Sequence, residues 1–306
     1  MRFRPFKANR AGEVKDGCPP LGGSRGAGYS LCAAGVSVGA SWGKYGRRGV
    51  EAITGLITQG DGVTMPVFWI MCGVSFIGSL VAAMWGLGGG ALVLAVMALY
   101  FPPAAMIPLH GVVQFGSNFG RAMIMWREVL WTLVPAFLVG TVLGAMIGAN
   151  TVMALPTPVL QIVVALFILY AAWAPKFKGG APSQPKFFVV GALGAFTTMF
   201  VGATGPLIAP FVGAASDDRH KVVATHGMLM TFQHGFKCIA FGIVGFAFAP
   251  YIALLAGMLG FGFLGTVAGR HVLLRMREDI FRTGFKIVLT ALAIRLGYGA
   301  IGKLVG

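Results

Sequence analysis

The chain has 306 residues, of which 57% are hydrophobic and only 11% are charged, whereas soluble globular domains carry about 25% charged residues. Together with a mean hydropathy of +0.80, this composition excludes soluble enzymes and soluble binding modules. The formal net charge of +15 does not indicate a nucleic-acid partner, because nine of the 24 Lys and Arg residues lie in the first 64 residues and no nucleic-acid-binding motif accompanies them.

Residues 1–64 are predicted to form a disordered basic extension. They carry nine Lys or Arg residues, four Asp or Glu residues and many glycines, but no apolar run long enough to cross a bilayer. The weakly apolar stretch from Tyr29 to Ser41 is short and lacks a convincing cleavage site, so it does not indicate a signal peptide. A natural start at Met65, where the first strong apolar run begins, is a second interpretation.

From Met65 onward, apolar segments follow one another, several of them about 20 residues long, which is enough to cross a ~30 Å hydrocarbon core. The first half, residues 65–173, contains the segments Met65–Trp85, Ala91–Phe101, Ala105–Met125, Val129–Ala149 and Pro158–Trp173. A hydrophilic linker over residues 174–186 separates it from the second half, residues 187–306. That half contains Phe187–Val201, Leu207–Ala215, Val222–Phe241, Val244–Ala268 and Phe281–Val305. The sequence therefore predicts an all-α polytopic membrane protein.

The two halves agree in where glycine interrupts an apolar segment. Gly86-Leu-Gly-Gly-Gly90 follows the first segment, and Gly202-Ala-Thr-Gly205-Pro206 holds the corresponding place in the second half. The same offset of 116 residues relates further pairs, namely His110 with His226, Arg121 with Lys237 and Gly144 with Gly260. Broken helices at equivalent positions of two halves mark the substrate sites of transporters. We therefore predict two internal repeats of four or five membrane segments each, with Gly-broken helices.

The basic loops indicate how often each half crosses the membrane. If each short segment after a break is a crossing, each half crosses five times and the loop cations share one side, which the positive-inside rule makes cytoplasmic. These cations are Arg121, Arg127, Lys176, Lys178, Lys186, Arg219, Lys221, Arg270, Arg275, Arg277 and Arg282. The halves are then inverted repeats, which is the interpretation we favour. If the short segments are re-entrant, each half crosses four times, the halves are parallel and the basic loops lie on both sides.

The embedded polar residues favour an anionic substrate. After Met65 the acidic residues lie only in loops or at span ends: Glu128, Asp217, Asp218, Glu278 and Asp279. Carriers of cations usually place Asp or Glu deep in the membrane, whereas backbone N–H groups at the positive end of a helix bind negative charge. We expect a small anion to bind Gly88, Gly89, Gly90, His110, Gln114, Asn118, Gly205, His226, Gln233 and Lys237, and to be attracted by Arg121 and Arg295.

Each of these features has a structural alternative. A glycine run also serves close helix packing, a histidine beside glycine also caps or bridges helices, and an arginine near a span end also reaches the bilayer surface. His226 and His234 are eight residues apart and lie near one helix face, but no carboxylate or thiolate joins them, so no metal is expected. No cofactor is expected either, because no strand precedes the glycine run as it does in a dinucleotide fingerprint.

Several motifs in a fixed order carry a resemblance to a known family. They are Gly86–Gly90, the short segment closed by Pro102-Pro103, the polar stretch from His110 to Asn118, Arg121, the Gly140/Gly144/Gly148 helix, Gly202–Pro206 and Ala293–Gly297. Through them, residues 65–306 resemble the sulfite exporter TauE/SafE family of membrane transporters. The resemblance implies a duplicated inner-membrane permease for sulfite, organosulfonates or related anions. Thr204 and Pro206 stand where the first half has Gly88 and Gly90, so the two breaks need not be equivalent.

We expect a multi-pass permease of the cell (inner) membrane that moves a small anion by alternating access between its repeats. An enzyme is not expected, because the spans contain no nucleophile, metal set or paired acid. A channel-like protein, and an accessory or assembly protein without carrier activity, remain alternatives. The expected partners are the lipid bilayer and the anion, and no nucleic acid. The sequence leaves open the identity of the anion, the direction of flux, the coupling ion and the oligomeric state, including a homo-oligomer.

Overall fold

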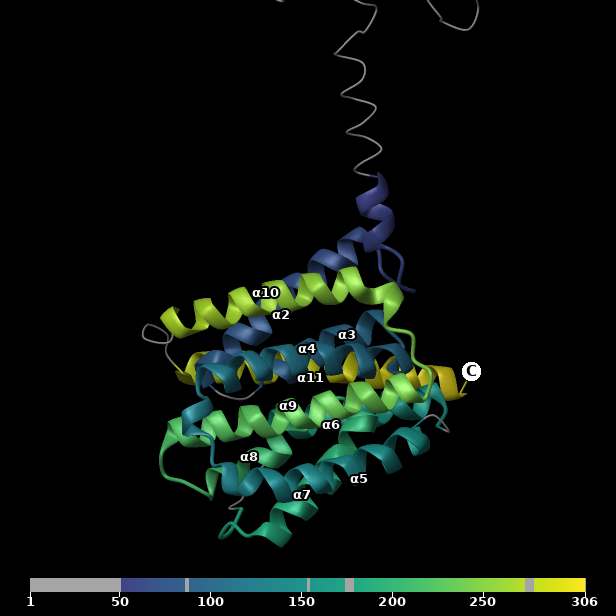
Figure 1. Ribbon diagram of the computed structural model, residues 1–306. Helices are drawn as coiled ribbons and strands as arrows, with labels where there is room; N and C mark the ends of the chain where they lie inside the picture. The colour runs from purple at the N-terminus through teal and green to yellow at the C-terminus, as the bar shows by residue number, and fades with distance from the viewer. Residues whose placement is uncertain (1–50, 86–87, 153–154, 174–178, 273–277, 306) are drawn as a thin grey trace, which may run out of the picture. The chain divides into compact units, whose positions relative to one another are not determined.

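The computed structural model describes residues 51–85, 88–152, 155–173, 179–272 and 278–305, which form helices and no strand (Figure 1). In the first half the helices are α2 (Met65–Trp85), α3 (Gly89–Tyr100), α4 (Pro103–Ile124), α5 (Val134–Val152) and α6 (Thr157–Trp173). In the second half they are α7 (Gln184–Val201), α8 (Gly205–Gly213), α9 (Arg219–Ile243), α10 (Ile252–Val272) and α11 (Glu278–Val305). Three single-turn 3₁₀ helices are η1 (Trp126–Glu128), η2 (Trp131–Leu133) and η3 (Ala249–Tyr251).

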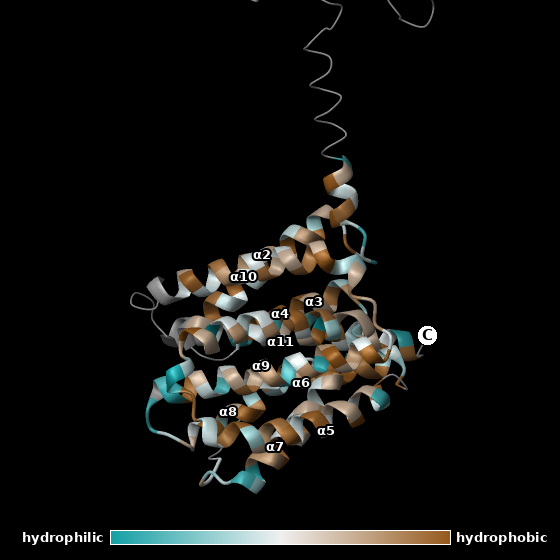
Figure 2. Ribbon diagram, in the orientation of Figure 1, coloured by the Kyte–Doolittle hydropathy of each residue, from teal (hydrophilic) through white to brown (hydrophobic). Residues whose placement is uncertain are grey.

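Among the described residues, 5 helical stretches are long and apolar enough to cross a membrane: Met65–Ala83, Trp131–Val152, Gln184–Val201, Ala249–Gly269 and Lys286–Leu304. Large hydrophobic side chains such as Met146, Leu193 and Ile294 are exposed on their outer faces. Figure 2 shows hydrophobic residues distributed along these helices rather than confined to a core. Such surfaces are stable in lipid, and the protein is therefore a multi-pass membrane protein.

The helices α4 and α9 form a central pair with a different composition. They contact each other, and they lie between the pair α2–α10 and the pair α5–α7 (Figure 1). They have 22 and 25 residues, which is long enough to cross a bilayer, but neither is among the apolar stretches. Their polar side chains, including His110, Asn118 and His226, are buried. Polar groups at membrane depth are stable when protein rather than lipid surrounds them.

Glycines allow the outer pairs to approach closely. A Cβ atom at Gly144 of α5 would lie 2.0 Å from the carbonyl oxygen of Ala192 on α7. On the opposite side of the molecule, a Cβ atom at Gly265 of α10 would lie 2.1 Å from the carbonyl oxygen of Phe76 on α2. Small residues at such crossings bring helix backbones together and strengthen van der Waals packing, which is the main attraction between helices in lipid.

The described loop cations lie at one end of the helix bundle. The backbone N–H of Leu130, after α4, donates to Thr225 Oγ1 near the start of α9 at 2.9 Å. The side chain of Gln184, at the start of α7, donates to the carbonyl oxygen of Thr132 at 2.5 Å. These contacts place Arg127, Lys186 and Lys221 together, and we call this the basic end. At the other end, the rings of Phe101 and Tyr251 lie 6.4 Å apart.

Some boundaries differ from the expected ones. The segment expected from Val129 begins as α5 only at Val134, because η1 and η2 turn the chain first. The segment expected from Val244 begins as α10 at Ile252, since Gly245 has a φ of 102° and Pro250 cannot occupy a helix interior. The helix α7 begins at Gln184, inside the linker expected over residues 174–186.

The N-terminal extension expected over residues 1–64 is described only from residue 51. Residues 51–57 are helical, and the side chain of Val63 is 4% exposed, so this part differs from the disorder expected of it. Gly60 lies against the ring of Tyr251, because a Cβ atom added at Gly60 would be 2.4 Å from that ring. Residues 1–50 lie outside the described residues, as do the predicted loop cations Lys176, Lys178, Arg275 and Arg277.

Candidate functional site

Two short helices, α3 and α8, begin in the middle of the molecule beside the central pair. Gly88, directly before α3, has a φ of 98°, and Gly202, directly after α7, has a φ of 84°. Side chains are strained at such positive φ values, so glycine is the residue that allows the chain to turn there. The first backbone N–H groups of each short helix lack acceptors within the helix and carry its positive dipole end.

A cavity of about 40 Å³ lies where the starts of α3 and α8 meet α4 and α9, and we call it the inner cavity. It is lined by Ala82, Gly88, Gly89, Gly90, Ala91, Gln114, Asn118, Arg121, Ala203, Gly205, Pro206, His226, Met230 and His234. None of these described lining residues is acidic. Helix N-termini and guanidinium groups favour negative charge, so this cavity is a candidate site for a small anionic group.

Arg121 is held in the wall of the inner cavity by a chain of hydrogen bonds. Its Nη2 donates to Asn118 Oδ1 at 2.7 Å, and its Nη1 to the carbonyl oxygen of Ala82 at 3.3 Å. The Nδ2 of Asn118 in turn donates to the carbonyl oxygen of Gln114 at 2.8 Å. Arg121 is 9% exposed, so it is a largely buried cation whose planar group is oriented before any ligand arrives.

His110 and Lys237 lie behind the inner cavity and join the two breaks. The Nδ1 of His110 lies 3.0 Å from the carbonyl oxygen of Gly202, and its Nε2 lies 2.9 Å from that of Gly90. Lys237 Nζ donates to the same Gly202 oxygen at 2.8 Å. A neutral imidazole has a single N–H, so His110 donates to both carbonyls only when it is protonated. Both side chains are fully buried, and they fix the backbone of the breaks.

The helix α9 contributes two histidines to the wall of the inner cavity. His226 Nε2 lies 3.2 Å from the carbonyl oxygen of Gly205. The ring of His234 stands edge-on to that of His110, with centroids 6.1 Å apart. The Nδ1 atoms of His226 and His234 are buried and have no protein hydrogen-bond partner among the described residues. Buried polar atoms are rarely left without a partner, so these two are candidates to contact a ligand.

The structure separates the predicted site residues into three groups. Those that line the inner cavity are Gly88, Gly89, Gly90, Gln114, Asn118, Arg121, Gly205 and His226. Those that bond to the backbone around the breaks are His110, Lys237 and Gln233, whose Nε2 donates to Gly194 O at 2.9 Å and to Thr204 Oγ1. The third group is Arg295 alone, which is exposed on α11 and is not among the lining residues, in contrast to the attraction expected of it.

The residues His234, Pro206 and Met230 line the inner cavity, but the sequence did not place them among the substrate-binding residues, although His234 belongs to the embedded polar residues that favour an anion. The available signal was the spacing of eight residues between His226 and His234, which places both near one helix face. That spacing was considered for a metal, and no set of three His, Cys, Asp or Glu that could hold one occurs among the described residues.

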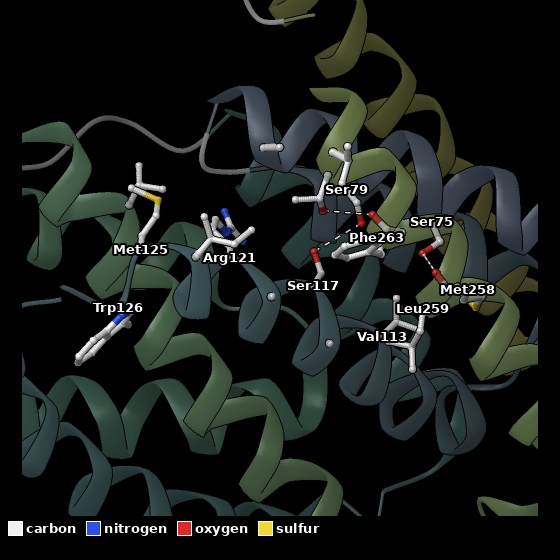
Figure 3. Close-up of a pocket in the computed structure, with 18 of the residues that line it drawn as sticks. Ser75, Ser79, Val113, Ser117, Arg121, Met125, Trp126, Met258, Leu259 and Phe263 are labelled. Atoms are coloured by element: carbon white, nitrogen blue, oxygen red, sulfur yellow. Dashed lines mark hydrogen bonds between the residues drawn. The ribbon is translucent and has the colours of Figure 1, made fainter. Parts of the chain in front are cut away.

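A larger cavity of about 1040 Å³, which we call the outer cavity, lies between α2, α4 and α10 (Figure 3). Ser75 and Ser79 of α2 and Ser117 of α4 line it, with the oxygens of Ser79 and Ser117 3.4 Å apart. Trp126, Arg127, Glu128 and His220 line it at the basic end. Arg121 lines both cavities, so its side chain lies between the two spaces.

Comparison with known proteins gives a family match. The model of the family described as Sulfite exporter TauE/SafE matches residues 71–296, a range that includes every residue named above as lining the inner cavity. No curated protein and no solved structure matches the chain.

Proposed function

Because the chain belongs to the sulfite exporter TauE/SafE family, we propose that it is an inner-membrane permease for small sulfur-containing anions such as sulfite and organosulfonates. The observation that carries this proposal is the inner cavity, where the N-termini of α3 and α8 meet Arg121 and no described lining residue is acidic. Its small volume of about 40 Å³ favours a compact anionic group over a large organic molecule, and we propose that this group is a sulfite ion or the head of a sulfonate.

In the proposed complex, each part of the cavity wall has a distinct role. The first-turn N–H groups of Gly89, Gly90 and Gly205 donate to the anion oxygens. Arg121 compensates the negative charge through its planar guanidinium, and the side-chain amide of Gln114 supplies a further donor. His110 and Lys237 do not touch the anion but hold the breaks in the geometry that directs the N–H groups inward.

We further propose that residues 65–173 and 187–306 are two repeats around a pseudo-two-fold axis. Under the offset between the breaks, α2 corresponds to α7 and α5 to α10, and the observed neighbours are α2 with α10 and α7 with α5. The same offset relates α4 to α9 and α6 to α11, and the two helices of each of these pairs contact each other. Similar contacts also support the proposal, since Nε2 of His110 faces Gly90 O and Nε2 of His226 faces Gly205 O, one residue before the position equivalent to Gly90.

The directions of the short helices favour inverted repeats. From the inner cavity, α3 runs to Phe101, whose ring lies by Tyr251 at the end of the bundle away from the basic end. The helix α8 runs the other way, toward the basic end. The carbonyl oxygen of Pro210, in the second half of α8, lies 2.4 Å from the position that a Cβ atom would take at Gly179. Lys186, which belongs to the basic end, donates to the carbonyl oxygen of Gly179. On this account each half has five segments, and the positive-inside rule assigns the basic end to the cytoplasm.

We propose alternating access as the transport mechanism, in which one repeat rocks against the other around the bound anion. A small cavity at the junction of the two repeats is suited to this mechanism, because a modest relative movement exposes it to one side or the other. Single-channel currents from the purified protein would instead favour the channel-like alternative.

The test is saturable uptake of radiolabelled sulfite into proteoliposomes, with sulfate, thiosulfate, sulfoacetate and acetate as competitors. Arg121→Gln is expected to weaken uptake about 10- to 100-fold, since a hydrogen bond from a charged group contributes about 1.5–3 kcal/mol. Lys303→Gln, which removes a charge from an exposed residue at the end of α11, is the matched control and is expected to retain uptake. Folded wild-type protein that moves none of these anions would contradict the proposal.

A further inference from the structure

The inner cavity and the outer cavity have one described lining residue in common, the cationic Arg121. Arg121 lines both spaces, and Figure 3 shows it between the serines of α2 and α4 on one side and Trp126 on the other. The outer cavity, at about 1040 Å³, is far larger than the anion proposed for the inner one. A space of this size is therefore better suited to access than to tight binding of sulfite.

The outer cavity exists because α4 has small residues on the face that turns toward α2 and α10. Gly116, Ser117 and Gly120 line it, and a Cβ atom added at Gly120 would meet nothing within 4 Å. At the equivalent positions, α9 carries Phe232, Gln233 and Phe236, which are large. The half built around α9 thus has bulk where the half built around α4 has open space.

The wall of the outer cavity is mostly apolar, but it carries serine hydroxyls along α2 and α4 and charged side chains toward the basic end. The hydroxyl of Ser75 donates to the carbonyl oxygen of Met258 at 2.6 Å, and the Ser79–Ser117 pair lies one turn further along α2. Arg127, Glu128 and His220 lie at the mouth. With Arg121 at the inner limit, we expect the positive charge of its guanidinium to attract anions toward the inner cavity.

We propose that the outer cavity is the path by which the anion passes between the basic end and the inner cavity, and that Arg121 is the residue that selects for negative charge on this path. This inference rests on the proposed function, because it takes the inner cavity as the substrate site. It adds the route, the side from which the site is reached and the residue that controls passage.

The first test measures thiol accessibility and does not depend on transport. The background variant replaces Cys18, Cys32, Cys72 and Cys238 with alanine. A single cysteine is then introduced as Ser117→Cys in the outer cavity. It is treated in oriented vesicles with methanethiosulfonate reagents that carry either a sulfonate or a trimethylammonium group. A Lys221→Cys variant identifies the side on which the basic end lies, since Lys221 is exposed there.

We expect the Ser117→Cys thiol to react from the same side as the Lys221→Cys thiol, and about tenfold faster with the anionic reagent than with the cationic one. Adding Arg121→Gln is expected to abolish that preference while leaving the thiol accessible. Ala195→Cys is the buried control, because Ala195 occupies the position equivalent to Ser79 and is 0% exposed. Absence of reaction at Ser117→Cys, reaction from the opposite side only, or a charge preference that survives Arg121→Gln would overturn the inference.

A second test fills the outer cavity. Gly120→Phe introduces into α4 the residue that α9 has at the equivalent position, and the structure offers space for it. Gly260→Phe is the matched control, because Gly260 is exposed on α10, does not line the outer cavity and also has nothing within 4 Å of an added Cβ atom. We expect at least a tenfold lower rate of sulfite uptake for Gly120→Phe and an unchanged rate for Gly260→Phe.

The two tests separate the failure of this inference from the failure of the proposed function. If wild-type protein moves no sulfite, the proposed function fails whatever the thiol reactions show. If wild-type protein transports sulfite but Gly120→Phe transports it equally well, the outer cavity is not the path and the inference alone fails. Equal thermal stability of the two phenylalanine variants in detergent shows that a lower rate reflects blockage rather than misfolding.

Discussion

The two sides of the central helix pair, which the proposed repeats make equivalent, differ in how closely their helices pack. On one side, α2, α10 and α4 surround the outer cavity of about 1040 Å³. On the other side, α7, α5 and α9 are closely packed, with Gly144 of α5 against the backbone of Ala192 and Gly191 of α7 against that of Phe137. If the outer cavity is the proposed path, one helix arrangement serves for access on one side and for closure on the other.

The equivalent cations Arg121 and Lys237 show the same contrast at the level of single residues. Arg121 lines both cavities and bonds to Asn118, so its charge is available to a ligand. Lys237 is fully buried, and its Nζ donates to the carbonyl oxygen of Gly202. Gly111 leaves room for it, since an added Cβ atom there would lie 2.6 Å from Lys237 Cε. On the proposed function, Arg121 faces the ligand and Lys237 stabilises a break.

The largest expected effect follows from the packed side. Gly144→Val places a side chain where even a Cβ atom would lie 2.0 Å from the Ala192 carbonyl oxygen, so α5 and α7 must separate. We expect destabilisation of at least about 3 kcal/mol and loss of most folded protein. Gly120→Val on the open side is the control, and it is expected to unfold at nearly the wild-type temperature in detergent. Equal yields and melting temperatures for the two variants would show that the two sides do not differ in packing.

The next prediction separates the roles of the two cations. Lys237→Met removes a buried donor from Gly202 O, and we expect a stability loss of about 1–3 kcal/mol with sulfite affinity less affected. Arg121→Gln is expected to show the reverse, with affinity lowered and the melting temperature little changed. Thermal unfolding and the KM for sulfite uptake, measured on both variants, provide the comparison. The assignment fails if both variants lose affinity equally and neither loses stability.

A smaller change tests the size of the inner cavity. At Gly205, an added Cβ atom would lie 3.5 Å from His226 Cε1, which is ordinary van der Waals contact, so Gly205→Ala is expected to fold normally. Its methyl group takes up much of the inner cavity, and we expect about a tenfold rise in KM for sulfite. Gly213→Ala at the other end of α8, where nothing lies within 4 Å, is the control and is expected to leave KM unchanged. An unchanged KM in Gly205→Ala would place the anion elsewhere.

The smallest effect is expected at Arg295. Because this residue is exposed on α11 and does not line the inner cavity, Arg295→Gln is expected to change sulfite uptake by less than about twofold. A loss comparable to that of Arg121→Gln would restore the role in anion attraction that the sequence suggested for it.

The residues of the proposed site could be selected from the sequence because their signals are local or follow the offset of 116 residues, and their role in binding stays a prediction. The glycine runs at Gly88 and Gly202 report backbone conformations that few other residues adopt, and the offset identified His110 and His226 as equivalent. The inner cavity brings together residues from both breaks, which was expected from the two-half pattern. Composition alone was sufficient for the helical membrane class.

Other features depend on contacts between helices that are distant in sequence. Whether Gln233 and Lys237 line the cavity or support it is decided by the rotation of α9 against α7, which a spacing of residues does not report. The outer cavity likewise depends on how α10 packs beside α2 and α4. Arg295 was expected to act because an intramembrane arginine is costly, but hydropathy does not show which direction a helix face points.

The most direct test of the central claim is to locate the bound anion. Selenite, the heavier analogue of sulfite, should first compete with sulfite for uptake, and crystals grown with selenite should then be measured at the selenium absorption edge. The account predicts an anomalous peak in the inner cavity, within hydrogen-bonding distance of the Gly90 and Gly205 backbone N–H groups and of the Arg121 guanidinium. A peak at another place, with the inner cavity empty in protein that transports sulfite, would contradict it.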